Sequence, residues 1–213
     1  MRFTAWPALI MAARRAPIID FGTGLLVLIG IVRMFVLVLH DPMLGYANQY
    51  DMARTSACVD LWPSLPAPER YEAHLSAPLP YDIERHARAA HCYRSSVVVF
   101  VLGAKFLIAV AHAAGLVPED RFPLQAVGVA GALALIVLVL AFLRAERARP
   151  WARLAHASIF AVVLTDPANT LWLNTLYTEP AALFFAYAVA GLLALKVITH
   201  PGRAAATAMI VAL

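Results

Sequence analysis

The chain has 213 residues, of which 62% are apolar and only 14% carry a charged side chain. An ordinary soluble domain is about 45–50% apolar and about 25% charged, and a soluble globule of this size cannot bury so much apolar surface. The composition therefore excludes a soluble enzyme, a disordered chain and a nucleic-acid-binding protein. The formal net charge of +4 does not indicate DNA, because the arginines lie beside apolar runs, as they do in the loops of membrane proteins.

Four apolar runs are long enough, at about 20 residues, to cross the hydrocarbon core of a bilayer as helices. They are Ile18–Leu39, Ser95–Ala114, Phe122–Leu143 and Pro180–Ile198. The run Leu154–Leu164 is too short to cross unaided, so we expect a re-entrant element or part of one helix that continues through the polar residues after it. The chain ends within another short run, Ala204–Leu213, as a truncated protein or a fragment would. The sequence thus predicts an all-α, polytopic transmembrane helical bundle, with residues 1–213 in a single transmembrane domain.

The N-terminal residues decide the predicted orientation. Arg2, Arg14 and Arg15 precede the first run, and no small-residue cleavage site follows it, so we expect an uncleaved anchor rather than a signal peptide. The positive-inside rule then places the N-terminus in the cytoplasm and the first loop outside. The segment Arg144–Arg153, "RAERARPWAR", conflicts with this orientation, because it would lie outside after three spans although it carries four arginines.

Both cysteines, Cys58 and Cys92, lie in the long loop of residues 41–94, and none lies in an apolar run. This placement favours a disulfide, and disulfides form in oxidising compartments, so the loop is predicted to be extracytoplasmic, in agreement with the N-terminal arginines. The loop opens with a predicted amphipathic helix that has Tyr46 and Tyr50 on one face. The arginine- and alanine-rich composition is typical of a GC-rich bacterial genome, so the predicted location is a bacterial inner membrane.

No P-loop, dinucleotide-binding glycine motif, serine-hydrolase elbow, zinc-protease motif or CxxC pair occurs in the chain, so neither a cofactor nor a metal is expected. The remaining signals are polar groups beside apolar runs. Asp41 and Asp51 lie just beyond the first run, and Lys105 lies in the middle of the second, seven residues from His112. An ionisable group within a span is a functional candidate by default. Arg33, near the end of the first run, is expected to reach lipid headgroups or to bind substrate.

The segment "TDPANTLWLNTLYTEP" is dense in polar groups and lies between two apolar runs. Asp166 before Pro167 is a good helix start, with the aspartate as N-cap and the proline at the first helical position. Glu179 before Pro180 is expected to open the next span in the same way, and Asn174 lies between the two. These residues therefore have a structural as well as a functional interpretation.

The opening of the long loop, "DPMLGYANQYDMARTSA", after a cytoplasmic N-terminus and one span, resembles the GT-C superfamily of membrane glycosyltransferases. The comparison is with the branch that holds protein O-mannosyltransferases and lipid A aminoarabinose transferases. The later run "RAERARPWARLAHASIFAVVLTDPANTLWLNTLYTEPAALFFAYAVAGLLAL" is similar to that family's arginine-ended span, short helix, polar turn and further span. The family's Asp-Glu pair is not present, since Asp41 is followed by Pro42 and Asp51 by Met52. Family members have more spans, so the chain resembles their N-terminal half.

The resemblance implies that a sugar passes from a polyprenyl-phosphate donor to an acceptor hydroxyl with inversion. This chemistry needs a carboxylate near the acceptor proton and cations for the leaving phosphate; it does not require a metal. Asp51 is the expected base, with Asp41 in reserve. The expected phosphate ligands are Arg54, Lys105 and Arg33, and the expected sugar or acceptor ligands are Asn174 and Glu179.

Two other classes stay open at this point. A truncated, catalytically inactive membrane protein or scaffold would explain the abrupt end of the chain. A transporter would place Lys105 and His112 along a path, although the large loop and the absence of internal repeats argue against it. The expected partners are the polyprenyl-phosphate-linked sugar, the lipid bilayer, and a second chain or a missing C-terminal half, with no nucleic acid.

Overall fold

The computed structural model describes residues 6–46, 52, 55–64, 81–83, 95–118 and 121–199 of the chain. The α-helices are α1 (Trp6–Val38), α3 (Val98–Ala113), α4 (Gln125–Ala145), α5 (Pro150–Ile159), α6 (Pro167–Thr170) and α7 (Glu179–Thr199). Two short 3-10 helices are η1 (Ala57–Val59) and η3 (Leu171–Asn174), and η2 (Phe160–Leu164) is a π-helix. The strands are β1 (Leu61–Pro63), β2 (Tyr81–Ile83) and β3 (Arg121–Phe122).

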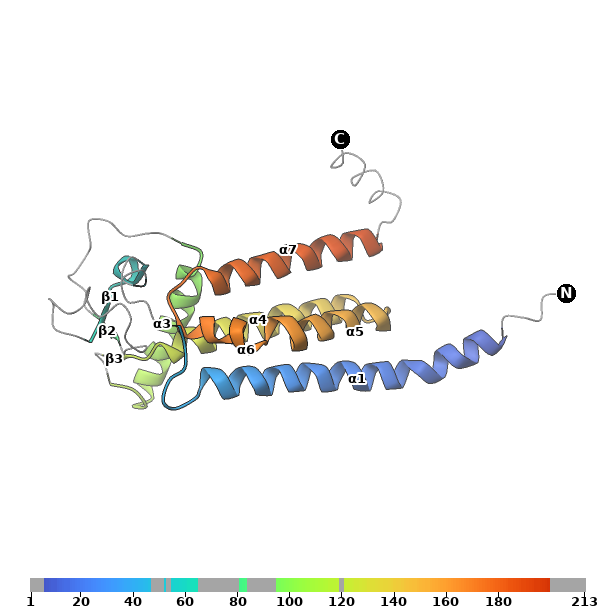
Figure 1. Ribbon diagram of the computed structural model, residues 1–213, viewed down its shortest axis with the longest axis horizontal. Helices are drawn as coiled ribbons and strands as arrows, with labels where there is room; N and C mark the ends of the chain where they lie inside the picture. The colour runs from blue at the N-terminus through green and yellow to red at the C-terminus, as the bar shows by residue number, and fades with distance from the viewer. Residues whose placement is uncertain are drawn as a thin grey trace, which may run out of the picture.

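Among the residues that the structure describes, three helices contain a segment that is long and apolar enough to cross a membrane. These segments are Pro17–Val38 in α1, Gln125–Ala145 in α4 and Glu179–Val197 in α7. All three helices run along the long axis of the molecule (Figure 1). Three of the four predicted full-length runs therefore form the expected helices, and the described part of the chain is mostly helical with three candidate membrane-spanning helices.

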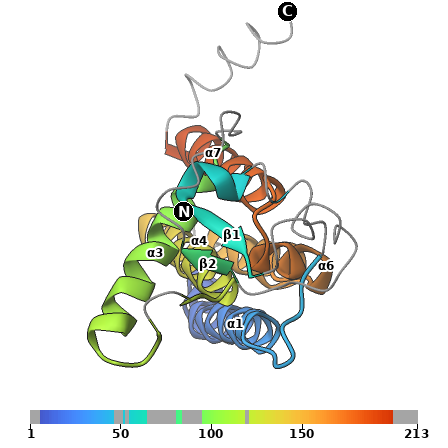
Figure 2. The same ribbon diagram turned by 90° about the vertical axis from the view of Figure 1, so that its left-hand side faces the viewer.

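α3 differs from the full span that its sequence predicts. The run Ser95–Ala114 forms a helix of 16 residues, about 24 Å long at 1.5 Å per residue, which is shorter than the hydrocarbon core of about 30 Å. Residues 96 and 97 form a turn ahead of the helix, and α3 lies across one end of the bundle instead of along its axis (Figures 1 and 2). An apolar run in a sequence shows only its length and its hydropathy. A helix that lies at the membrane interface and a helix that spans the membrane can have the same values, so the sequence could not predict the direction of α3.

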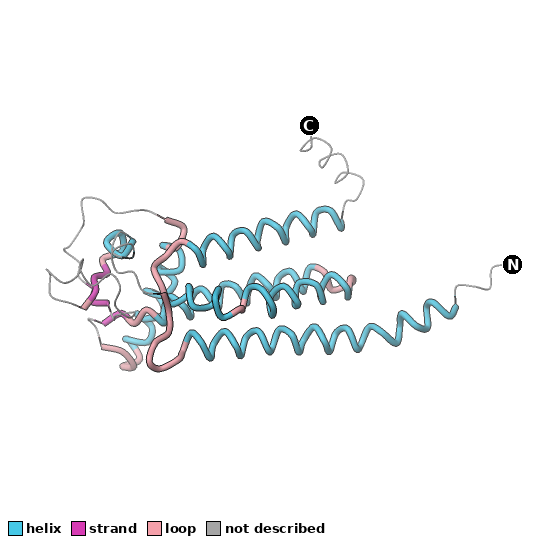
Figure 3. Tube along the Cα trace, in the orientation of Figure 1, coloured by secondary structure: helices cyan, strands magenta, loops and turns pink. Residues whose placement is uncertain are grey.

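The short run after the arginine segment forms an interrupted helix. α5 continues into the π-helix η2, and a break at Thr165 and Asp166 separates η2 from α6 and η3 (Figure 3). The Asp166 carboxylate accepts a hydrogen bond from the backbone N–H of Ala168 at 2.9 Å, and Pro167 occupies the first turn of α6. The predicted helix start at Asp166 is therefore confirmed, and so is the start of α7 at Glu179.

A small sheet lies at the same end of the molecule as α3, so the all-α prediction was incomplete. Its strands are antiparallel in the order β1-β2-β3, with Leu61 opposite Ile83 and Tyr81 opposite Phe122. No pattern in the sequence indicates these strands, because each has only two or three residues and pairs with residues far away in the chain. The Tyr81 and Phe122 side chains are fully buried and join the apolar cluster that lies under α3.

The two ends of the bundle differ in composition. We call the end that carries the sheet and α3 the sheet end. The opposite end carries the α4–α5 turn with Arg144–Arg153, and we call it the arginine end. There Arg153 Nη1 donates to Asp20 Oδ1 on α1 at 2.7 Å, so the arginine segment lies beside the N-terminal half of α1 (Figure 1).

Candidate functional site

Two of the predicted carboxylates, Asp41 and Glu179, lie at the sheet end, and the third, Asp51, lies outside the described residues. Asp41 is exposed in the turn after α1, and Glu179 is exposed at the first residue of α7. Asp51, Arg54 and Cys92 lie outside the described residues. The predicted catalytic base and the predicted disulfide from Cys58 to Cys92 therefore stay predictions.

Lys105 lies near the middle of α3 and is half-buried. Because α3 crosses the sheet end, the ammonium group belongs to that end and not to the middle of a span. His112 lies seven residues further along α3, and its Nδ1 atom is 2.9 Å from the carbonyl oxygen of Val117 in the turn after the helix. Neither position supports a path for transport along the bundle axis.

Arg33 contacts the π-helix. The backbone N–H of Thr165 donates to the carbonyl of Phe160 at 3.0 Å, one residue further back than in an α-helix, so the carbonyl of Ala161 loses its usual partner. Arg33 Nη2 donates to this carbonyl and, at 3.0 Å, to the hydroxyl of Thr165. Gly30 allows the approach of α1, because a Cβ there would lie 2.6 Å from the Phe160 ring. The guanidinium thus satisfies backbone groups that the helix interruption exposes.

Asn174 is buried and links η3 to the C-terminal end of α1 by hydrogen bonds. Its Nδ2 atom donates to the carbonyl of Val38 at 3.0 Å and to that of Leu44 at 2.9 Å, so it satisfies a carbonyl at the C-terminus of α1. The side chain also lies against Gly128, where an added Cβ would be 2.1 Å from Asn174 Oδ1. Asn174 therefore has two backbone contacts that account for its position without a substrate.

Aromatic side chains gather near η3 at the sheet end. Tyr46 packs on Trp172 with ring centroids 4.1 Å apart, and Trp172 meets Tyr177 edge-on at 5.0 Å. Tyr46 lies in the loop after α1 and not in a helix, so the predicted amphipathic helix does not include this residue. Burial, and secondarily the neighbouring Tyr177, raises the pKa of the Tyr81 hydroxyl, so this phenol is neutral at physiological pH.

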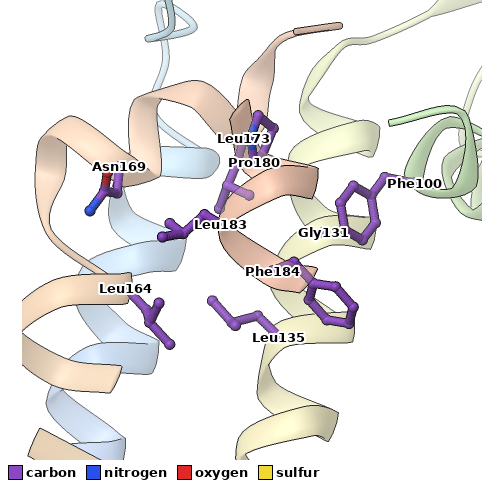
Figure 4. Close-up of a pocket in the computed structure, with 9 residues that line it drawn as sticks. All are labelled: Phe100, Gly131, Leu135, Leu164, Asn169, Leu173, Pro180, Leu183 and Phe184. Atoms are coloured by element: carbon purple, nitrogen blue, oxygen red, sulfur yellow. The ribbon is translucent and has the colours of Figure 1, made fainter. Parts of the chain in front are cut away.

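A small crevice between α4 and α7 lies near the same end (Figure 4). Its volume is about 20 Å³, which is room for about one water molecule. Phe100 and Phe184 meet edge-on at its side, with ring centroids 5.4 Å apart. Asn169 is its polar residue, and the amide of this side chain donates to the carbonyl of Val163 at 2.8 Å. The crevice is too small for a substrate.

The arginine end holds a cluster that the sequence did not single out. Glu146 is the C-cap of α4 and is fully buried. His156 on α5 lies between two partners, with Nε2 3.3 Å from Glu146 Oε1 and Nδ1 3.0 Å from the hydroxyl oxygen of Tyr187 on α7. Phe142 stacks on His156 at a centroid distance of 5.1 Å. Gly191 admits this ring, because a Cβ there would lie 2.4 Å from Phe142.

A cavity of about 300 Å³ adjoins this cluster between α4, α5 and α7. Glu146, His156 and Tyr187 form its polar wall. The rest of its lining is apolar and mostly small: Ala152, Ala155, Ile159, Ala190, Gly191 and Ala194. Among the described parts of the chain, this is a site where a large cavity, buried ionisable groups and small wall residues coincide.

The sequence obscured this cluster for two reasons. Glu146 lies among four arginines in a charged turn, where a solvated carboxylate is the ordinary expectation. His156 and Tyr187 lie in apolar runs 31 residues apart, so no spacing links them. The available signal was the histidine itself, because an ionisable residue within an apolar segment next to a membrane boundary is a functional candidate.

Within the described ranges, no group of three or more His, Cys, Asp or Glu side chains could hold a metal ion. Comparisons of the chain with protein-family models, with curated proteins and with solved structures find no match.

Proposed function

We propose that the chain is the membrane part of a glycosyltransferase of the GT-C kind, which transfers a sugar from a polyprenyl-phosphate donor to an acceptor hydroxyl at the sheet end. The observation that carries the proposal is the position of α3 across that end (Figure 2). α3 exposes apolar side chains such as Val99, Leu102 and Phe106, while its other face packs on α4. A helix in this position fits the plane of the membrane interface, which is where the phosphate of a lipid-linked sugar lies.

The two arginine groups support one orientation under this proposal. Arg14 and Arg15 precede the apolar part of α1, and Arg144–Arg153 lies at the same end of the bundle. If α3 does not cross the membrane, both groups face the cytoplasm and the positive-inside rule holds for both. The sheet end then faces outward from a bacterial inner membrane, and so does the loop that carries the cysteines.

The proposed chemistry uses Asp41, Lys105 and Glu179 at the sheet end, together with Asp51 and Arg54, which lie outside the described residues. Asp51, or Asp41 in its place, accepts the acceptor's hydroxyl proton as the acceptor oxygen attacks the anomeric carbon. The polyprenyl phosphate leaves with the electron pair of the broken bond, and Lys105 and Arg54 pair with its charge. Glu179, exposed at the start of α7, is a hydrogen-bond acceptor for a sugar hydroxyl.

A membrane scaffold without catalysis is the second candidate. The observation that favours it is the use of Arg33 and Asn174: both were expected to bind substrate, and both donate to backbone carbonyls. A scaffold needs these contacts and no base. The two candidates differ in whether the sheet end recognises a prenyl phosphate.

The experiment measures binding of undecaprenyl phosphate, the leaving group shared by donors of different sugars, to the purified chain in nanodiscs. Undecaprenol, which lacks the phosphate, is the matched ligand. We expect a rise in the melting temperature with the phosphate alone. We also expect at least tenfold weaker binding for Lys105→Ala, while Lys196→Ala, the chain's other lysine, binds as the native chain does. Equal effects of the two lipids would overturn the proposal and favour the scaffold.

A further inference from the structure

The cavity at the arginine end has a wall group whose position needs an explanation. The Glu146 carboxylate is fully buried, and it lies at the C-terminal end of α4, where the helix dipole disfavours a negative charge. A charge that is buried without hydrogen bonds is strongly disfavoured relative to the same charge in water. Fold stability alone therefore does not account for a carboxylate at this position.

His156 lies beside only one of the two carboxylate oxygens. Its Nε2 atom is 3.3 Å from Glu146 Oε1, which is within ion-pair distance, but neither oxygen accepts a hydrogen bond from the described residues, and Oε2 has no ion-pair partner among them either. The other ring nitrogen contacts the Tyr187 hydroxyl, so the histidine is held in place by α7. The Glu146 carboxylate is therefore a hydrogen-bond acceptor that His156 contacts on one side. Its remaining lone pairs adjoin the cavity.

The cavity is open to an amphiphile. Its volume of about 300 Å³ lies at the lower limit of small-molecule sites and suits a lipid headgroup better than a whole lipid. Ile159 lines it and is 42% exposed, and Val189 and Leu193 on the neighbouring surface of α7 are 57% and 58% exposed. Acyl chains can therefore remain against the outer surfaces of α5 and α7.

The cavity has a carboxylate in its wall, and the exposed groups next to that carboxylate in the sequence are arginines. Glu146 lines the cavity and is buried, whereas Arg144 in the last turn of α4 and Arg147 in the connection to α5 are exposed and lie within two residues of Glu146 in the sequence, outside the cavity lining. Arg153 forms an ion pair with Asp20 and is not part of the proposed site. An acceptor inside and exposed guanidinium groups outside match a zwitterion whose ammonium group enters and whose phosphate stays at the rim.

We propose that this cavity binds the headgroup of a phospholipid with a primary ammonium group, with the ammonium at Glu146 and the phosphate at Arg144 and Arg147. A purely anionic lipid would satisfy the arginines and leave the carboxylate without a donor. A choline lipid carries the positive charge but has no N–H to donate. The site is independent of the proposed transferase, because it lies at the opposite end of the bundle.

The experiment is native mass spectrometry of the full chain, released from mixed micelles that contain equal amounts of phosphatidylethanolamine, phosphatidylcholine and phosphatidylglycerol. We expect retained phosphatidylethanolamine to exceed each of the other two lipids at least tenfold. Glu146→Gln should abolish this preference. Asp20→Asn, which removes an exposed carboxylate at the same end, should leave it intact.

A second variant guards against misfolding of Glu146→Gln. Ala155→Phe fills the cavity from α5 and keeps the carboxylate, so it should also lose the preference while its melting temperature in choline lipid stays close to that of the native chain. Equal retention of the ethanolamine and choline lipids by the native chain would overturn the proposal. So would an ethanolamine preference that survives in both Glu146→Gln and Ala155→Phe, because the cavity would then hold only water.

Discussion

The two ends of the bundle use their polar residues in opposite ways. Near the sheet end, Arg33 and Asn174 looked like ligands for a substrate, but Arg33 Nη2 and Asn174 Nδ2 donate to backbone carbonyls of the protein. Arg33 Nε and Asn174 Oδ1 have no partner among the described residues. At the arginine end, Glu146 looked like a solvated charge, but it is fully buried and no described group donates to it. The density of polar residues in a sequence therefore does not locate unsatisfied groups.

The difference has a physical basis. A helix that stops inside a bilayer must have its free carbonyls satisfied by side chains, so polar residues collect where helices break, as they do around η2 and η3. A ligand site instead needs a polar group that the protein itself does not satisfy. Only the tertiary structure separates the two cases, because it shows which donors reach which acceptors.

The largest expected effect tests the proposed transfer chemistry. Asp51→Asn should lower transfer of the sugar from its polyprenyl-phosphate donor by about 10²–10⁴-fold, which is the usual contribution of a general base. Asp82→Asn is the matched control, since that carboxylate accepts a hydrogen bond from Ser64 at 2.6 Å and is not proposed to meet substrate. Unchanged turnover in Asp51→Asn would move the role to Asp41.

The next effect tests whether Asn174 is structural. Asn174→Ala leaves the carbonyls of Val38 and Leu44 without their donor, so it should destabilise the fold by about 2–6 kcal/mol, at about 1–3 kcal/mol for each lost partner. Thermal unfolding in detergent measures this loss. Asn169→Ala, which removes one hydrogen bond, should cost only about 0.5–1.5 kcal/mol. Equal losses in the two variants would contradict the comparison drawn above.

A smaller effect tests the packing that holds the cluster at the arginine end. Gly191→Ala brings a methyl group within 2.4 Å of the Phe142 ring, and overpacking of this kind costs about 1–3 kcal/mol. Gly24→Ala in α1 meets nothing within 4 Å and should not lower the melting temperature. A normal melting temperature for Gly191→Ala would mean that α7 does not pack this closely on α4.

The smallest expected effect is a difference in stability between Glu146→Gln and the native chain that changes sign with the lipid. In nanodiscs of phosphatidylcholine, Glu146→Gln should stabilise the chain by about 1–2 kcal/mol, because a buried charge without a donor is removed. In nanodiscs that contain phosphatidylethanolamine, the native chain should gain stability from its ligand and the variant should not. Melting temperatures in the two lipids measure both arms, and a lipid-independent difference would contradict the account of the site.

The sequence predicted much of the helical framework and little of its use. Run length identified α1, α4 and α7, and local rules identified the N-cap at Asp166, since both depend on neighbouring residues. The direction of α3 and the pairing of Tyr81 with Phe122 depend on contacts between distant residues, which no local pattern encodes. The approach of His156 and Tyr187 to Glu146 joins three helices, and neither charge nor hydropathy along the chain could indicate it.

The central claim is that α3 lies across the sheet end and does not cross the membrane. Cysteine accessibility in right-side-out vesicles tests it, with single cysteines placed by Asp41→Cys, Leu116→Cys and Arg147→Cys after Cys58 and Cys92 are replaced by serine. Leu116, in the turn after α3, is 77% exposed. The account predicts that an impermeant maleimide labels positions 41 and 116 in intact vesicles and position 147 only after permeabilisation. Labelling of 41 and 147 in intact vesicles, with 116 protected, would contradict it.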